Sequence, residues 1–326
     1  MKKIVLILLS VVSVLLLTAC SQVEEGEFPN TENMKAVDMS QEEMLEYLEE
    51  VEYVENQIYA FTLNLDMSYT YQSTEFTGDF LSGTIDSYQV EKKMVSNVDL
   101  QAFVSLSKDF ESIDEMIIEA NYDIFASQGG GKTSYTTSES SGQLGVYVQD
   151  EMLYISTDIK TEEDGVESTI SSKQKTGLES MFSGEDTEFN KTIIDIDEFT
   201  NEDMSEIDQM HMYKKGSVDY IEFSLKQDVL SGNEYFDTIS DMIGMDVIDD
   251  MEQKPANSLE FSFVIAVKDQ EVIQSAYRIS LDLNDEYDSY FTFTVVLDVI
   301  DKMEDFPNDL DEYQLVPDLS GLFFGM

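Results

Sequence analysis

The chain of 326 residues is strongly acidic, with 68 aspartates and glutamates against 18 lysines and arginines and a formal net charge of −50. Such a charge repels nucleic acid, so we expect no nucleic-acid partner. Apolar residues make up 42 % of the chain, which is enough for a packed core and excludes a disordered acidic tail. Cys20 is the only cysteine, so no disulfide can form within one chain.

The first twenty residues have the pattern of a secretory signal that ends in a lipid-attachment cysteine. Lys2 and Lys3 supply the positive start, an apolar run follows from Ile4 to Leu17, and small residues precede Cys20. This run is shorter than the roughly 20 residues that a membrane-spanning helix needs. The tetrapeptide Leu17-Thr18-Ala19-Cys20 resembles the lipobox of bacterial lipoproteins.

That resemblance implies a membrane anchor. In such lipoproteins the cysteine thiol carries a diacylglyceryl group through a thioether, and a signal peptidase removes the residues before it, here residues 1–19. Each buried CH₂ contributes about 0.8 kcal/mol, and two or more acyl chains anchor a protein stably. We therefore expect a protein held by Cys20 on the extracytoplasmic face of the cell membrane. The alternative is an uncleaved N-terminal anchor helix in which Cys20 has no role.

The next residues predict a spacer and then a helix. Residues 20–39 are polar and acidic with no apolar period, which favours a flexible tether. A capping box at Ser40 to Glu43 precedes apolar residues at helical spacing, including Met44 and Leu48. We expect an amphipathic helix that covers a sheet and begins a single β-rich domain over residues 40–326.

From Phe61 onward the apolar period falls to two, which indicates half-buried strands. Short turns between neighbouring strands predict antiparallel pairing. We expect about eleven strands, near residues 61–71, 79–90, 94–107, 116–126, 144–149, 152–159, 166–173, 217–226, 258–268, 271–283 and 289–300.

Other segments interrupt this pattern. Ser127 to Gly142 is rich in glycine, serine and threonine and predicts a flexible surface loop. Its Gly129 to Thr133 portion lacks the earlier glycine of a phosphate-binding loop, so we expect no phosphate site. Inserted helices are predicted at Gly177 to Phe182, at Asn201 to Met210 and near residues 233–252.

These elements predict an α+β fold with a large, curved, half-barrel-like antiparallel sheet, a leading helix and inserted helices. The leading helix, the long meander and the closing segment Phe306-Pro307-Asn308-Asp309-Leu310 resemble the LolA/LppX-like lipoproteins. In that family a half-barrel sheet wraps helices and encloses an apolar cavity. The resemblance therefore implies a cavity for a hydrophobic ligand.

The side chains that catalyse reactions or bind metals are sparse. His211 is the only histidine, and we expect it to be a surface residue. Acid clusters at Asp195 to Glu198, Asp282 to Asp288 and Asp305 to Glu312 do not fit the EF-hand loop, and solvated turns explain them better than calcium sites. We expect no enzyme activity, no cofactor and no metal site.

Two functions remain open. In the first, a monomeric lipid-anchored protein binds a hydrophobic ligand in a cavity on the concave side of the sheet. Its candidate lining residues are inward-facing apolar residues of the strands, namely Leu65, Met67, Val104, Phe263 and Ile279. In the second, the same sheet is solidly packed by helices, and the protein acts without a small-molecule ligand through non-catalytic contacts in the envelope.

Overall fold

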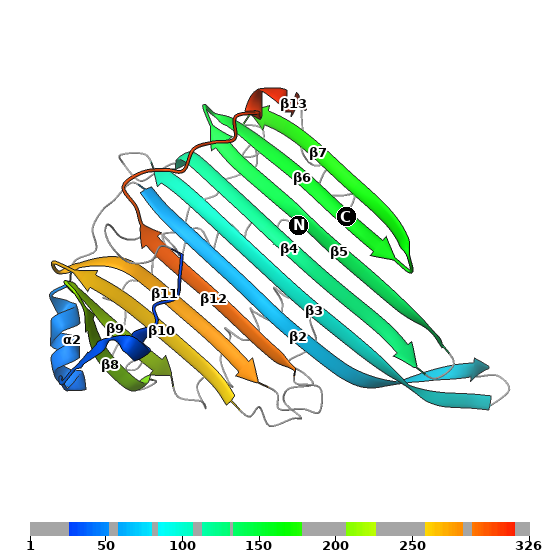
Figure 1. The fold of residues 1–326 in the computed structure, drawn as a ribbon, viewed down its shortest axis with the longest axis horizontal. Helices are drawn as coiled ribbons and strands as arrows, with labels where there is room; N and C mark the ends of the chain where they lie inside the picture. The colour runs from blue at the N-terminus through cyan, green and yellow to red at the C-terminus, as the bar shows by residue number, and fades with distance from the viewer. Residues whose placement is uncertain are drawn as a thin grey trace, which may run out of the picture.

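The computed structural model describes residues 26–51, 58–79, 84–106, 113–130, 133–177, 207–225, 258–282 and 289–316. Within these residues the chain forms one sheet of 13 strands, one α-helix and two short 3-10 helices (Figure 1). The strand pairs are antiparallel, except that β13 pairs in parallel with β7. A large antiparallel sheet is therefore confirmed.

The sheet is built from two meanders. β2 to β7 pair in chain order, β8 to β12 do the same, and the pairing of β12 with β2 joins the two. Short strands lie at both borders, β1 beside β8 and β13 beside β7. The bounds are β1 (Lys35–Val37), α2 (Gln41–Glu49), β2 (Ile58–Asp79), β3 (Thr84–Leu106), β4 (Ile113–Gly130), β5 (Thr133–Gln149), β6 (Met152–Glu163), β7 (Val166–Gly177), β8 (Ile207–Lys215), β9 (Val218–Leu225), β10 (Ser258–Lys268), β11 (Glu271–Asp282), β12 (Tyr290–Val299) and β13 (Gln314–Leu315), with 3-10 helices at Thr31–Asn33 and Leu310–Glu312.

The two predicted strands at 79–90 and 94–107 are one continuous strand, β3. β12 pairs with β2 only as far as Ser68, and β4 pairs with β3 only as far as Glu91. Beyond those points β2 and β3 continue as a two-stranded ribbon, visible at the lower right of Figure 1. The predicted break between residues 90 and 94 is absent, because Lys92 and Lys93 stay in the ladder and pair with Tyr71 and Thr70.

The two faces of the sheet differ in chemistry. Leu63 and Leu65 of β2 point to one side, which we call the apolar face, and Asn64 and Asp66 point to the opposite face. The alternation predicted from Phe61 onward is therefore confirmed.

Helix α2 begins where the capping box predicted. Ser40 Oγ accepts a hydrogen bond from the Glu43 N–H at 3.3 Å, and the Glu43 carboxylate accepts one from the Ser40 N–H at 2.8 Å. Met44 packs onto the apolar face over β8 to β10. The Tyr47 hydroxyl donates to Asp219 of β9 at 3.2 Å, and burial together with this carboxylate raises the pKa of Tyr47 to about 12. The predicted leading helix is confirmed.

Residues 26–39 differ from the predicted flexible tether. β1 pairs with β8, and Phe28 and Met34 pack on the opposite face against a cluster that contains Tyr220. The guanidinium of Arg278, the only arginine, lies 4.0 Å from the Phe28 ring centroid. These apolar residues are too widely spaced to show a period in the sequence, yet each finds an apolar site on the sheet.

The prediction of a flexible loop from Ser127 to Gly142 is wrong. β4 runs to Gly130 and β5 starts at Thr133, so the segment is the end of a long hairpin. Aromatic side chains cover two of the glycines, since Tyr135 lies over Gly129 and Tyr122 lies beside Gly142. Such cover replaces the missing side chain and keeps a glycine-rich strand in the sheet.

The predicted helix at Asn201 to Met210 is also wrong where the structure describes it, because β8 starts at Ile207. Met210 and Met212 are buried while Gln209 and His211 are exposed, which is the period of a strand. Residues 178–182 and 233–252, where further helices were predicted, lie outside the described residues.

The closing segment predicted at Phe306 to Leu310 crosses the opposite face. Leu310 and Tyr313 are buried against Ile117 and Tyr147, with Phe306 packed beside them. This segment and residues 26–34 together cover two parts of the opposite face.

Candidate hydrophobic binding face

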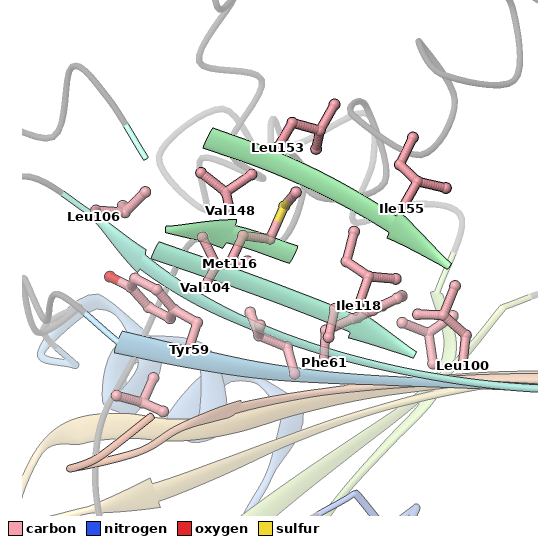
Figure 2. Close-up of a cluster of buried hydrophobic side chains, with 14 residues drawn as sticks. Tyr59, Phe61, Leu100, Val104, Leu106, Met116, Ile118, Val148, Leu153 and Ile155 are labelled. Atoms are coloured by element: carbon pink, nitrogen blue, oxygen red, sulfur yellow. The ribbon is translucent and has the colours of Figure 1, made fainter. Parts of the chain in front are cut away.

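Two buried clusters lie on the apolar face. The larger one, the β2–β6 cluster, contains side chains that all project from one side of the strands in Figure 2. The smaller one, the helix cluster, lies where α2 covers β8 to β10. The β2–β6 cluster contains Tyr59, Phe61, Leu100, Ala102, Val104, Leu106, Met116, Ile118, Val148, Leu153, Ile155, Val295, Leu297 and Val299. These side chains are at most 9 % exposed, so this part of the face is solidly packed.

A row of partly exposed apolar side chains runs along the margin of both clusters. The strand register places Phe223, Phe263 and Tyr277 next to one another on β9, β10 and β11. The next row joins Ile279 to Phe293 and Phe293 to Leu65. The first row continues from Tyr277 through Val295 to Leu63. We call six partly exposed side chains of these two rows the aromatic stripe: Phe223, Phe263, Tyr277, Phe293, Leu63 and Leu65.

The aromatic rings of the stripe lie in contact in pairs. The ring centroids of Phe223 and Phe263 are 5.7 Å apart, and those of Tyr277 and Phe293 are 5.9 Å apart. A tyrosine hydroxyl is neutral at physiological pH, and burial raises the pKa of the Tyr277 hydroxyl further. The stripe is therefore an uncharged surface of rings and branched side chains, the kind of surface that lines sites for apolar ligands.

The structure brings together four of the five residues predicted to line a ligand site. Leu65 and Phe263 belong to the stripe, and Ile279 pairs with Phe293 between them. Met67 is one row further along β2 and is 3 % exposed.

Val104 lies apart from the other four. It pairs with Tyr59, six residues along β2 from Leu65, which corresponds to about 20 Å. All five residues share the apolar face, but Val104 is part of the packed β2–β6 cluster.

Sequence reasoning missed Phe223, Tyr277 and Phe293 as site residues. Each was visible as an apolar member of a strand pattern. Their neighbourhood depends on the register between strands that are far apart in the chain, such as β12 and β2, and alternation along a single strand carries no information about that register.

The candidate catalytic and metal-binding residues do not converge in the part of the chain that the structure describes. His211 is exposed on β8 and its Nε2 lies 3.1 Å from Gln209 Oε1. In the terminal acid cluster Asp309 pairs with Lys173, and Asp305 pairs with Lys302 at 3.4 Å. No described group of three or more histidine, cysteine or acidic side chains could hold a metal ion. Residues 195–198 and 283–288 lie outside the described residues.

Comparison with known proteins gave no matching family model and no significantly similar curated protein. Over the described residues, no helix has the length and apolar character needed to cross a membrane.

Proposed function

We propose that this protein is an exported lipoprotein, anchored by Cys20 on the extracytoplasmic face of the cell membrane, that holds a hydrophobic ligand against the aromatic stripe. The lipobox at Leu17 to Cys20 supports the anchor. The observation that carries the binding function is the stripe itself, because its six apolar side chains remain partly exposed beside clusters that are fully packed.

The proposal includes the finer form of the fold. An α+β half-barrel with inserted helices, as in the LolA/LppX-like lipoproteins, would enclose the ligand between those helices and the apolar face. The apolar character of one continuous face across both meanders supports this arrangement. The ligand is bound without chemical change, so the protein is a carrier or receptor and not an enzyme, and it needs no cofactor.

The position of Gly26 bears on how the sheet would be oriented relative to the membrane. The Gly26 N–H donates to Asp298 Oδ2 at 2.8 Å, which fixes Gly26 on the opposite face. Cys20 lies six positions earlier, and a fully extended chain of that length spans at most about 20 Å. A lipid on Cys20 would therefore hold the opposite face toward the bilayer and the aromatic stripe away from it.

A second function, non-catalytic contact with other envelope components without a ligand, is supported by the packing of the β2–β6 cluster. Its side chains are at most 9 % exposed and leave little surface for a ligand over that part of the face. In this case the stripe would be covered by the protein's own chain.

Native mass spectrometry of a Cys20→Ser chain purified from a bacterial envelope distinguishes the two functions. The ligand-binding function predicts an added mass that a fluorescent fatty acid displaces. A bare polypeptide mass together with no binding of the fluorescent fatty acid would favour the second function. For the anchor, we expect the wild-type protein to partition into detergent with the added mass of acyl chains on Cys20, and a water-soluble product that begins elsewhere would contradict it.

A further inference from the structure

The hydroxyl of Tyr277 is the one polar group among the six side chains of the aromatic stripe. Its ring packs against Phe293 and the β2–β6 cluster, and burial alone raises the pKa of the hydroxyl. No hydrogen bond joins this hydroxyl to another group in the part of the chain that the structure describes. A hydroxyl that is withdrawn from water without a new partner is unfavourable, so Tyr277 has an unused donor.

Four other tyrosine hydroxyls of the described residues donate to carboxylates. These pairs are Tyr47 with Asp219, Tyr147 with Glu119, Tyr213 with Glu222, and Tyr290 with Asp66. The chain has 68 acidic residues, yet the strand register gives Tyr277 apolar partners, Phe263 on β10 and Val295 on β12. The protein therefore leaves this donor open within the stripe.

The apolar face near the stripe carries little charge. The alternation along the described strands β9 to β12 places a single charged residue, Asp219, on the same face as the stripe. Asp219 lies four residues along β9 from Phe223, about 13 Å away. There it pairs with Lys214 at 2.8 Å and accepts a hydrogen bond from Tyr47. These four strands therefore present no cation beside the stripe.

These surroundings favour an uncharged ligand. An ionised carboxylate that leaves water needs a cation or several donors, and the stripe offers one hydroxyl. The net charge of −50 also repels an anion that approaches the molecule. A carbonyl group without a charge avoids both costs, and its oxygen can accept the hydrogen bond that the Tyr277 hydroxyl is able to donate.

We propose that the ligand of the aromatic stripe is an uncharged acyl ester, and that the Tyr277 hydroxyl donates a hydrogen bond to its carbonyl oxygen. The acyl chain packs against the phenylalanine rings and leucines of the stripe. Tyr277 lies on β11, with Phe263 on one side and Phe293 on the other, so apolar surface continues on both sides of the hydroxyl. This inference rests on the binding function proposed above and adds the chemical class of the ligand and the residue that selects it.

Infrared spectroscopy of a bound ester tests this hydrogen bond directly. Methyl laurate with a ¹³C-labelled carbonyl is added to a Cys20→Ser chain, and the carbonyl stretch of the bound ester should lie at a lower wavenumber than in hydrocarbon solution. Tyr277→Phe removes only a hydroxyl that has no described partner, so the protein should fold. In this variant the stretch should return to its hydrocarbon value. The affinity should fall about three- to tenfold, the effect of one neutral hydrogen bond.

Tyr47→Phe is the matched control, because it removes a hydroxyl that donates to Asp219 from helix α2, away from the stripe. It should leave both the carbonyl stretch and the affinity for methyl laurate at their wild-type values. A stretch that Tyr277→Phe does not change would overturn the inference and leave the binding function intact, because the ester would then bind without this hydrogen bond. Failure of methyl laurate to bind the wild-type sheet at all would overturn the proposed binding function together with the inference.

A titration of laurate, the free acid of the same ester, tests the charge at the site. NMR of laurate with a ¹³C-labelled carboxyl gives its pKa in the complex and in solution. Because the stripe is apolar and the molecule is strongly acidic, bound laurate should have the higher pKa of the two. Binding of methyl laurate without binding of laurate would also support the inference. A lower pKa in the complex would show that a cation pairs with the carboxylate, which would overturn the uncharged ligand while the binding function stands.

Discussion

Gly26 donates its backbone N–H to Oδ2 of Asp298 at 2.8 Å, which ties the first described residue of the chain to the last strand of the second meander. Asp298 Oδ1 accepts a second hydrogen bond, from Gln274 Nε2 at 2.7 Å. Asp298 is 3 % exposed, so this carboxylate satisfies two donors at a site with little access to water.

We predict that Asp298→Ala lowers the free energy of unfolding by about 3 kcal/mol, because it leaves two donors without their acceptor. Asp298→Asn should cost about 1 kcal/mol. Its amide can still accept from Gly26 and can donate to Gln274 Oε1, which has no hydrogen-bond partner among the described residues. Urea unfolding of a Cys20→Ser chain measures both free-energy changes. Equal losses of stability in Asp298→Ala and Asp298→Asn would contradict the prediction, because they would show that the amide does not replace the carboxylate as an acceptor.

Gly130 lies at the end of the β4–β5 hairpin, within the segment that was predicted to be a loop. Its φ is +133°, and a Cβ atom there would lie 2.8 Å from the backbone carbonyl of Gln89. Gly130→Ala should therefore lower the free energy of unfolding by about 2 kcal/mol, through strain and overlap together. Gly165→Ala is the matched control, since its φ is +82° but no atom lies within 4 Å of the added Cβ. A larger loss at Gly165 than at Gly130 would contradict the packing described for this hairpin.

The capping box of α2 makes a pH-dependent contribution. Hydrogen bonds from the Ser40 backbone and then from its side chain lower the pKa of Glu43 from its usual 4.5. Because the folded-state pKa is the lower one, the stabilisation is present above pH 4.5 and is lost as the pH falls through the folded value. NMR titration should show the Glu43 pKa below 4.5 in the wild type. In Ser40→Gly only the hydroxyl contribution is removed, so the pKa should rise but stay below 4.5.

Substitutions of Phe263 and Val104 should distinguish side chains that bind the ligand from side chains that only pack in the core. Phe263→Ala should weaken the binding of a fluorescent fatty acid about tenfold, because it removes a central ring of the aromatic stripe. Val104→Ala should lower the free energy of unfolding by about 2 kcal/mol and leave the affinity unchanged, because Val104 belongs to the packed β2–β6 cluster. If Val104→Ala weakened binding as much as Phe263→Ala, the ligand would lie elsewhere on the apolar face.

The sequence was sufficient for elements whose signal is local. The capping box at Ser40 marks the start of α2 correctly. The alternation that begins at Phe61 identifies the strands and also shows which of their faces is buried. The Asp150-Glu151 and Asp269-Gln270 turns also lie where predicted, with positive φ at both central residues of each.

The errors occur where an element is stabilised by the side chains or backbone of a paired strand. Ser127 to Gly142 forms strands because Tyr122 and Tyr135 cover its glycines, and β8 replaces a predicted helix because β9 pairs with it. The aromatic stripe depends on the same kind of information, since Phe293 reaches Leu65 only through the β12–β2 register. Composition and local period do not contain that register.

The pairing of β12 with β2 also determines the order in which the molecule can be completed. A chain that emerges N-terminus first can pair β2 through β7 early, but Tyr59 of β2 lacks its partner Val299 until almost the entire chain is available. During that interval the long border of β2 is bare, with apolar side chains beside unpaired backbone groups. A chain cut short before Tyr290 would keep this border permanently, so truncated products should aggregate or be degraded, whereas the complete chain protects its first long strand with its last.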